Sequence, residues 1–149
     1  MFSLIVELAE YEHAADQVVG TEEMLEAALF GPEPAAEALI ADVGDEPAGF
    51  ALFYTSFSTW QCVPGIWLED LVVRERLRGA GVGGALVREL AAIALQRGYG
   101  RLEWAVLDWN APAMAFYDRL GASSADEWRL RRLDGAALQL VASGERPRP

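Results

Sequence analysis

The fold is decided by residues 67–84, which read WLEDLVV, then RERL, then RGAGVGG. The first seven residues alternate in hydrophobicity and predict a β-strand. Its faces are expected to carry Trp67, Glu69, Leu71 and Val73 on one side and Leu68, Asp70 and Val72 on the other. Helical periodicity follows through Val82, Leu86, Leu90 and Ile93. The stretch therefore predicts a strand, a basic loop and a glycine-rich entrance to a helix.

The glycine-rich entrance is typical of a site for an anion. Glycines let successive backbone N–H groups converge on one anion, and the helix dipole favours its negative charge. Arg74, Arg76 and Arg78 surround this entrance. In the strand before it, the carboxylate pair Glu69 and Asp70 is costly to bury unless it is used or paired. The sequence therefore predicts a phosphate site beside a buried acid.

Two other phosphate-binding motifs are excluded. Gly79, Gly81 and Gly84 match the dinucleotide fingerprint, and Glu103 follows at about the spacing that this motif requires. Its glycines should follow the strand at once, however, whereas five residues separate Val73 from Gly79. A Walker-type nucleotide site is excluded because the chain contains no lysine. An ordinary glycine-rich turn remains the plain structural alternative.

The composition is that of one folded domain. The chain has 149 residues, 52% of them hydrophobic, with one cysteine and one histidine. A disulfide framework is thereby excluded, a reducing compartment is favoured, and no His/Cys metal cluster is expected. No apolar run reaches membrane-spanning length, and the N-terminus lacks a positively charged leader. We expect a cytoplasmic domain over residues 1–143 and a disordered tail over residues 144–149.

Charge is unevenly distributed along the chain, whose net charge is −11. Residues 1–73 hold 14 Asp and Glu and no Lys or Arg, whereas residues 74–149 hold nine Asp and Glu and 12 Arg. Most of these acids are typical of a solvated surface. Functionally, the pattern indicates that cations approach one side while a phosphate-bearing ligand binds the other. A nucleic-acid partner is disfavoured by the net charge.

Four sequence blocks resemble the GNAT superfamily of N-acetyltransferases, and within it the diamine (spermidine/spermine) acetyltransferase branch. The acyl-CoA signature Arg/Gln-x-x-Gly-x-Gly/Ala is similar to RGAGVG at residues 78–83. The other blocks are LEDL at 68–71, DWN at 108–110 and AFYDRLGA at 115–122. The resemblance runs from about Leu4 to Leu140. It implies an α/β fold with a mixed, mostly antiparallel, V-splayed sheet flanked by helices.

The same resemblance implies the parts of an acetyl-transfer site that uses acetyl-CoA and no metal. Glu69 matches the general base, because a carboxylate must take the proton of an alkylammonium before the lone pair attacks. An ion pair with an arginine is the structural alternative for this residue. Tyr117 matches the general acid that protonates the departing thiolate, although a tyrosine on the apolar side of a helix is often part of the core. The matched acyl-CoA contacts are Leu71, Val72, Val73, Arg78, Gly79, Ala80, Gly81, Val82, Gly83, Gly84, Asn110, Ala111, Pro112 and Ala113.

A small cationic amine is the acceptor that the resemblance implies. Carboxylates and aromatic faces are the groups that hold such a cation. In the family the final strand contacts a second subunit, which implies a homodimer. The positions that match the acceptor site are Tyr11, Glu12, Glu69, Asp70, Glu103, Trp104, Asp126 and Trp128. Each of these alone is equally typical of a surface or a core.

The remaining elements follow from periodicity, capping and turn residues. Helices are expected at Leu4–Tyr11, from the Thr21 cap to about Leu29, after Asn110 and at Gly135–Ala142, and strands at Ala38–Val43, Ala48–Thr55, Arg101–Asp108 and Glu127–Leu133. Ser56 to Gly65 is expected to be a polar loop. Family members begin with a strand upstream of the first helix, and we expect this chain to lack it.

The sequence therefore predicts an N-acetyltransferase that transfers an acetyl group to a diamine, a polyamine or a lysine-like amino acid by direct attack. Two alternatives remain open at this point. One is acetylation of a protein or peptide amine, and the other is a module that binds acyl-CoA without catalysis. The Glu69 and Tyr117 pair argues against the second alternative.

Overall fold

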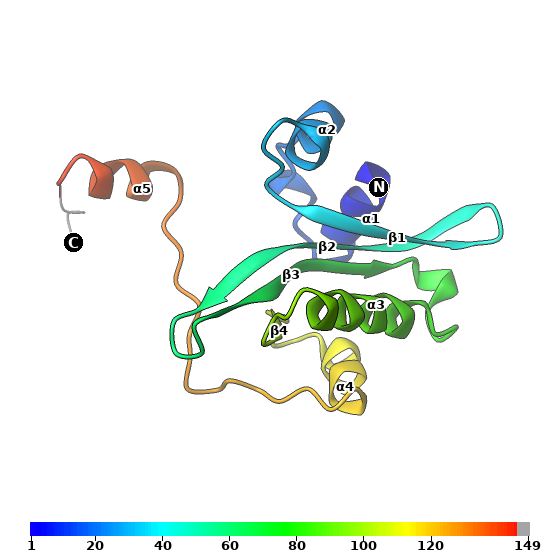
Figure 1. The fold of residues 1–149 in the computed structure, drawn as a ribbon. Coiled ribbons are helices and arrows are strands. Elements are labelled where there is room, and N and C mark those ends of the chain that lie inside the picture. The colour runs from blue at the N-terminus through cyan, green and yellow to red at the C-terminus, as the bar shows by residue number, and fades with distance from the viewer. Residues whose placement is uncertain (146–149) are drawn as a thin grey trace. The chain divides into compact units, whose positions relative to one another are not determined.

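The computed structural model describes residues 1–145 (Figure 1). The elements are α1 (Phe2–Tyr11), the 3-10 helix η1 (Ala15–Gln17), α2 (Glu22–Phe30), β1 (Glu37–Val43), β2 (Glu46–Ser58), β3 (Val63–Val73), the 3-10 helix η2 (Glu75–Leu77), α3 (Val82–Gln96), β4 (Leu102–Trp104), α4 (Ala111–Arg119) and α5 (Gly135–Ala142). They form two compact units, Met1–Ala111 and a second unit from Pro112 onward. A single domain over 1–143 stays a prediction, and residues 146–149 of the expected tail lie outside the described residues.

The first unit holds a four-stranded sheet in the order β1-β2-β3-β4. β1 pairs antiparallel with β2, β2 pairs antiparallel with β3, and β3 pairs parallel with β4. This arrangement confirms the predicted mixed, mostly antiparallel sheet. β4 pairs only with Ile66–Leu68, so within the described residues the rest of β3, up to Val73, has no strand beside it on that edge. That open edge is the splay that the sequence predicted.

Two apolar layers cover the sheet, one on each face. On one face α3 packs Leu86 and Leu90 against Phe53 and Leu68. On the other face α1 packs Leu4, fully buried, in a smaller cluster with strand residues of β2 and β3. Burying a Leu or Phe side chain contributes about 1.5–3 kcal/mol, so both clusters hold the helices to the sheet. Figure 1 shows α1 and α2 on one side of the sheet and α3 on the other.

Local signals in the sequence explain where the helices begin and end. The hydroxyl of Thr21 accepts a hydrogen bond from the backbone N–H of Met24 at 3.3 Å, which caps α2 as predicted. α3 ends just before Gly98, whose φ of 69° lies in the left-handed region that favours glycine. No helix within residues 1–145 has the length and hydrophobicity that spanning a membrane requires.

Three predicted elements are wrong in extent or type. The hairpin strands β2 and β3 pair as far as Ser58 and Val63, so the long polar loop is only a short turn. Cross-strand pairing here overrides polar composition. β4 has three residues rather than eight. Residues 127–133 form no strand, because in the described chain no neighbouring strand pairs with them, and Leu130 is 70% exposed.

Candidate active site

A β-bulge in β3 sets the direction of both candidate carboxylates. Leu52 pairs with Asp70 and Phe53 pairs with Leu68, so Glu69 is an extra residue in the ladder. Leu68 and Leu71 both pack on the α3 side, which leaves Glu69 and Asp70 together on the side that carries α1. The predicted alternation, which put the two acids on opposite faces, is therefore wrong. We call the sheet surface on the α1 side that bears Glu69 and Asp70 the acid face.

Three carboxylates converge on the acid face. Asp70 is half-buried, and burial, then the charge of Glu69, then that of Glu12 raise its pKa to about 6. Glu12 is the C-cap residue of α1, and burial also raises its pKa. Because α1 brings Glu12 to the strand, residues far apart in the sequence form one negative site. This arrangement attracts a cation and provides a carboxylate that titrates near neutral pH.

Two aromatic residues that the sequence analysis missed flank Glu69. The indole N–H of Trp67 donates a hydrogen bond of 2.9 Å to Oε2 of Glu69. Tyr54 is the cross-strand partner of Trp67, and burial, followed by the charge of Glu69, raises the pKa of its phenol. The predicted alternation already put Trp67 on the face of Glu69, whereas Tyr54 joins them only through the register of β2 and β3, which one strand's sequence does not show.

The glycine-rich entrance has the geometry that an anion needs. Gly81 is the N-cap of α3 with φ 86° and ψ 0°, and no side chain caps the helix there. A Cβ at Gly79 or Gly81 would meet nothing within 4 Å, so the space in front of the turn is open. The first N–H groups of a helix lack intrahelical acceptors and point outward. The residues present therefore fit a phosphate group.

One cluster joins the end of α1 to the glycine-rich turn. The guanidinium carbon of Arg78 lies 4.5 Å from the ring centroid of Tyr11, and Nε of Arg78 donates to the carbonyl of Val73 at 3.1 Å. The hydroxyl of Tyr11 donates to Oδ1 of Asn110 at 3.4 Å, and its ring lies 6.0 Å from that of Trp109. Tyr11, which is predicted to bind the acceptor, thus contacts two residues that are predicted to bind the acyl donor.

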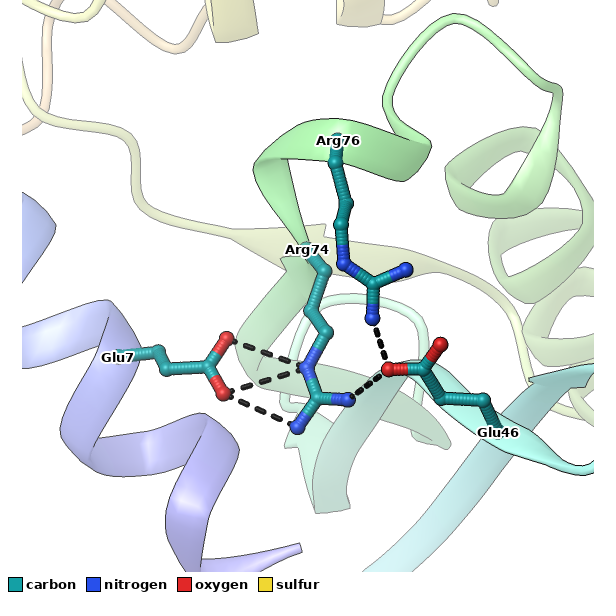
Figure 2. A network of polar contacts seen from close by, with 4 residues as sticks. All are labelled: Glu7, Glu46, Arg74 and Arg76. Carbon is teal, nitrogen blue, oxygen red and sulfur yellow. Dashed lines mark hydrogen bonds and ion pairs between the residues drawn. The ribbon is translucent and has the colours of Figure 1, made fainter.

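An ion-pair network fixes α1 on the sheet. Figure 2 shows Arg74, which follows β3, between Glu7 of α1 and Glu46 at the start of β2. Arg74 donates to Glu7 at 3.0–3.3 Å and to Glu46 at 2.7 Å, and Arg76 also bonds Glu46. The Arg74 side chain is only 20% exposed, so solvent screens these bonds less than surface pairs. The network helps to hold Tyr11 and Glu12 at the acid face.

The other residues predicted to bind the acceptor do not all lie on the acid face. Glu103 pairs with Trp67 in the register of β3 and β4 and forms an ion pair with Arg101 at 2.6 Å. Trp104 packs against the core on the α3 side, opposite the acid face. Asp126 and Trp128 belong to the second unit and are exposed.

Tyr117, the predicted acid, also belongs to the second unit. It lies on α4 with its ring 5.1 Å from that of Phe116. Burial raises the pKa of Tyr117 to about 12, so the phenol keeps its proton at neutral pH. That protonation state is the one that a general acid requires.

The raised pKa of Asp70 predicts a pH-dependent gain in stability for Asp70→Asn. Because the native state binds this proton more tightly than the unfolded state, wild-type protein gains stability as pH falls through about 6 and loses it as pH rises. At about pH 8 the variant should exceed wild type by on the order of 2 kcal/mol in free energy of unfolding, and near pH 4 this gain should vanish. Denaturant unfolding at both pH values measures the difference.

Asp45→Asn, at the exposed turn between β1 and β2, is the matched control and should show no such pH-dependent difference. An Asp70→Asn variant with the same stability offset at both pH values would contradict the buried-charge account.

Comparison with known proteins identifies the family. The model of the acetyltransferase (GNAT) family matches residues 5–122. The thialysine N-epsilon-acetyltransferases of Bos taurus and Caenorhabditis elegans are each 40% identical to this chain, over 93% and 95% of it and over 88% and 89% of their own lengths. The solved structure of a Vibrio cholerae integron cassette protein is 28% identical, with a TM-score of 0.77 over 92% of this chain and 86% of its own. The predicted family, fold and enzyme class are confirmed: the chain belongs to the acetyltransferase (GNAT) family and is an N-acetyltransferase.

Proposed function

We propose that this enzyme transfers the acetyl group of acetyl-CoA to the primary amine of a small cationic acceptor by direct attack. The observation that carries the proposal is the convergence of Glu12, Glu69 and Asp70 on one face, beside an open helix entrance with an arginine. The two thialysine-acetylating relatives support a lysine-like acceptor. A diamine or a polyamine carries the same terminal ammonium and belongs to the same proposal.

In the proposed reaction, Glu69 takes a proton from the acceptor ammonium, directly or through one water. The freed lone pair attacks the thioester carbonyl carbon, so a C–N bond forms while the C–S bond breaks. The nitrogen releases its second proton to solvent as the amide forms. Tyr117 supplies the proton that the departing thiolate takes up, and it regains one from solvent. Trp67 supports this scheme because its N–H occupies Oε2 of Glu69 and leaves Oε1 available to the acceptor.

The acyl donor, in this proposal, is held by the chain's own backbone. N–H groups of Gly79–Gly84 bind its phosphates at the entrance of α3, and Arg78 adds a positive charge. The edge of β3 from Leu71 to Val73, which β4 leaves open, is available to the pantetheine chain and to the thioester carbonyl. Residues 110–113 form the second contact.

The proposal also includes a cytoplasmic homodimer in which Asp126 and Trp128 serve the neighbouring active site. The exposed free thiol of Cys62 suits a reducing compartment. Leu130 and Leu133 are 70% and 53% exposed, and apolar side chains exposed in one segment are typical of an interaction surface.

An amine screen with purified protein and acetyl-CoA tests the proposed function. We expect kcat/KM to fall in the order putrescine, butylamine, γ-aminobutyrate, because the acid face favours added positive charge and disfavours a carboxylate. The KM for putrescine should rise with salt, since the Debye length falls from about 10 Å at 0.1 M to about 3 Å at 1 M. Initial rates of thiol release measure both.

Heat-treated enzyme and a reaction without amine provide the baselines. Faster turnover of neutral or acidic peptides than of every small amine would contradict the proposal and favour protein acetylation. Binding of acetyl-CoA without turnover of any acceptor would favour a non-catalytic module.

A further inference from the structure

A cavity lies next to the acid face, between α2 and the edge of the sheet. It has a volume of about 750 Å³ and is lined, among others, by Leu29 and Phe30 at the end of α2, Ala38 of β1 and Tyr54 of β2. Ala38 pairs with Leu52, a residue on the α1 side of the sheet. Small-molecule sites usually enclose roughly 300–1,000 Å³ and are mostly apolar. The cavity therefore has the size of a small-ligand site.

The lining of this cavity offers no free charge to a ligand. Glu37 is the one charged residue among those that line it. The guanidinium of Arg97 donates to both of its carboxylate oxygens, at 2.5 and 2.6 Å, and these hydrogen bonds lower the pKa of Glu37. Placing a second ammonium there would remove its water shell without a free carboxylate to replace it. The cavity is therefore suited to an uncharged group.

Tyr54 connects the cavity to the candidate base. Its side chain lines the cavity, and its cross-strand partner Trp67 holds Glu69 through the indole N–H. Tyr54 is also close enough to Glu69 for that charge to act on its phenol. A ligand with one end at Glu69 and the other in the cavity would pass along the ring of Tyr54, which is 37% exposed.

We propose that this cavity binds the uncharged tail of the acceptor, so that the enzyme also acetylates primary amines with alkyl or aryl tails. This inference rests on the proposed function and specifies its acceptor. The ammonium head is held at Glu69, and the tail lies along Tyr54 between α2 and β1. Short diamines keep both charges near Glu12 and Asp70, whereas longer apolar amines extend into the cavity.

The test is a series of linear primary amines from propylamine to octylamine, with phenethylamine as the aryl member. Burying one methylene is worth about 0.8 kcal/mol, so kcat/KM should rise about threefold to fourfold per added methylene until the cavity is filled. The gain should appear mainly in KM, because the tail is far from the reacting atoms. If kcat/KM stayed constant along the series, the assignment of the cavity would be overturned.

Two variants alter the cavity in opposite ways. Ala38→Leu fills it and should remove the gain for hexylamine and octylamine while butylamine is unchanged. Phe30→Ala removes an apolar wall and should flatten the rise without adding bulk; because Phe30 is 81% exposed, this variant should fold even where Ala38→Leu does not. Ala27→Leu, on the exposed side of α2, is the matched control. If kcat/KM rose with tail length as it does in wild type in both Ala38→Leu and Phe30→Ala, the proposal would also be overturned.

A charged tail tests the charge argument. Octylamine should have a higher kcat/KM than 1,8-diaminooctane, because the second ammonium of the diamine would enter a cavity that offers no free carboxylate. Equal turnover of the two amines would contradict a site for an uncharged tail. If putrescine and butylamine are acetylated but longer tails add nothing, only the cavity assignment fails. If no small amine is acetylated at all, the proposed function fails and this inference with it.

Discussion

Replacing Glu69 with glutamine is expected to lower kcat/KM for amine acceptors by about 10²-fold or more, in line with the usual contribution of a general base. The amide keeps the size of the side chain and can still accept the hydrogen bond from Trp67, but it cannot take the proton of an ammonium. Because the bulge sets the backbone at this position, the variant should fold as wild type does. Initial rates over a range of pH, together with a melting curve, measure the effect.

Glu89→Gln makes the same chemical change on α3, where Glu89 is exposed on the other side of the sheet, and it should keep wild-type rates. The decisive comparison uses alkaline pH, where free amine accumulates in solution. At that pH the loss of kcat/KM in Glu69→Gln should be smaller, because the acceptor arrives already deprotonated. A variant that keeps wild-type rates at every pH would remove Glu69 from the mechanism.

Replacing Gly81 with aspartate is expected to abolish measurable binding of acetyl-CoA. Gly81 is the N-cap of α3, and the substitution puts a carboxylate in the open space where the phosphates are proposed to bind. Repulsion between two anions at a helix N-terminus then replaces the attraction of the dipole. A ligand that binds the native state raises the melting temperature, so the shift produced by acetyl-CoA in wild type should be absent in the variant.

The same helix offers a matched control for this substitution. Gly98 follows the other end of α3, also has a positive φ of 69°, and would also place a Cβ in open space. Gly98→Asp therefore carries a similar backbone strain, of order 1 kcal/mol or more, far from the proposed phosphates. It should lower the melting temperature but keep the shift with acetyl-CoA. An equal loss of the shift in both variants would contradict a phosphate site at Gly81.

Much of the fold could be predicted from short-range signals in the sequence. The Thr21 cap, the glycines around α3 and the apolar periodicity of that helix each act within a few residues. The structure contains the two helices that these signals predict, α2 and α3. The strand predicted at 127–133 failed for the opposite reason. Its alternating pattern is compatible with a strand, but a strand also needs a neighbour to pair with, and a pattern within one segment does not show whether a neighbour exists.

In the candidate site, too, the residue types are visible in the sequence, whereas their arrangement depends on contacts between segments that are distant in the chain. The carboxylates of Glu69 and Asp70 are visible in the sequence, and so is the glycine turn. Their common direction is not, because it depends on one extra residue in the pairing of β2 with β3. Tyr54 and the cavity beside it likewise become apparent only when the register is known. Resemblance to a family singled out the two acids as candidate site residues, but it did not supply the geometry that joins them.

The bulge at Glu69 makes the site depend on the length of a strand as well as on its residues. Deleting one residue between Leu68 and Leu71 would restore a regular ladder and remove a local defect in the sheet. The same deletion would leave one acid where two now lie side by side. Sheet regularity and the proposed role of the two acids therefore oppose each other at this position. In an evolving lineage, the number of residues between Leu68 and Leu71 should therefore be kept together with the two acids.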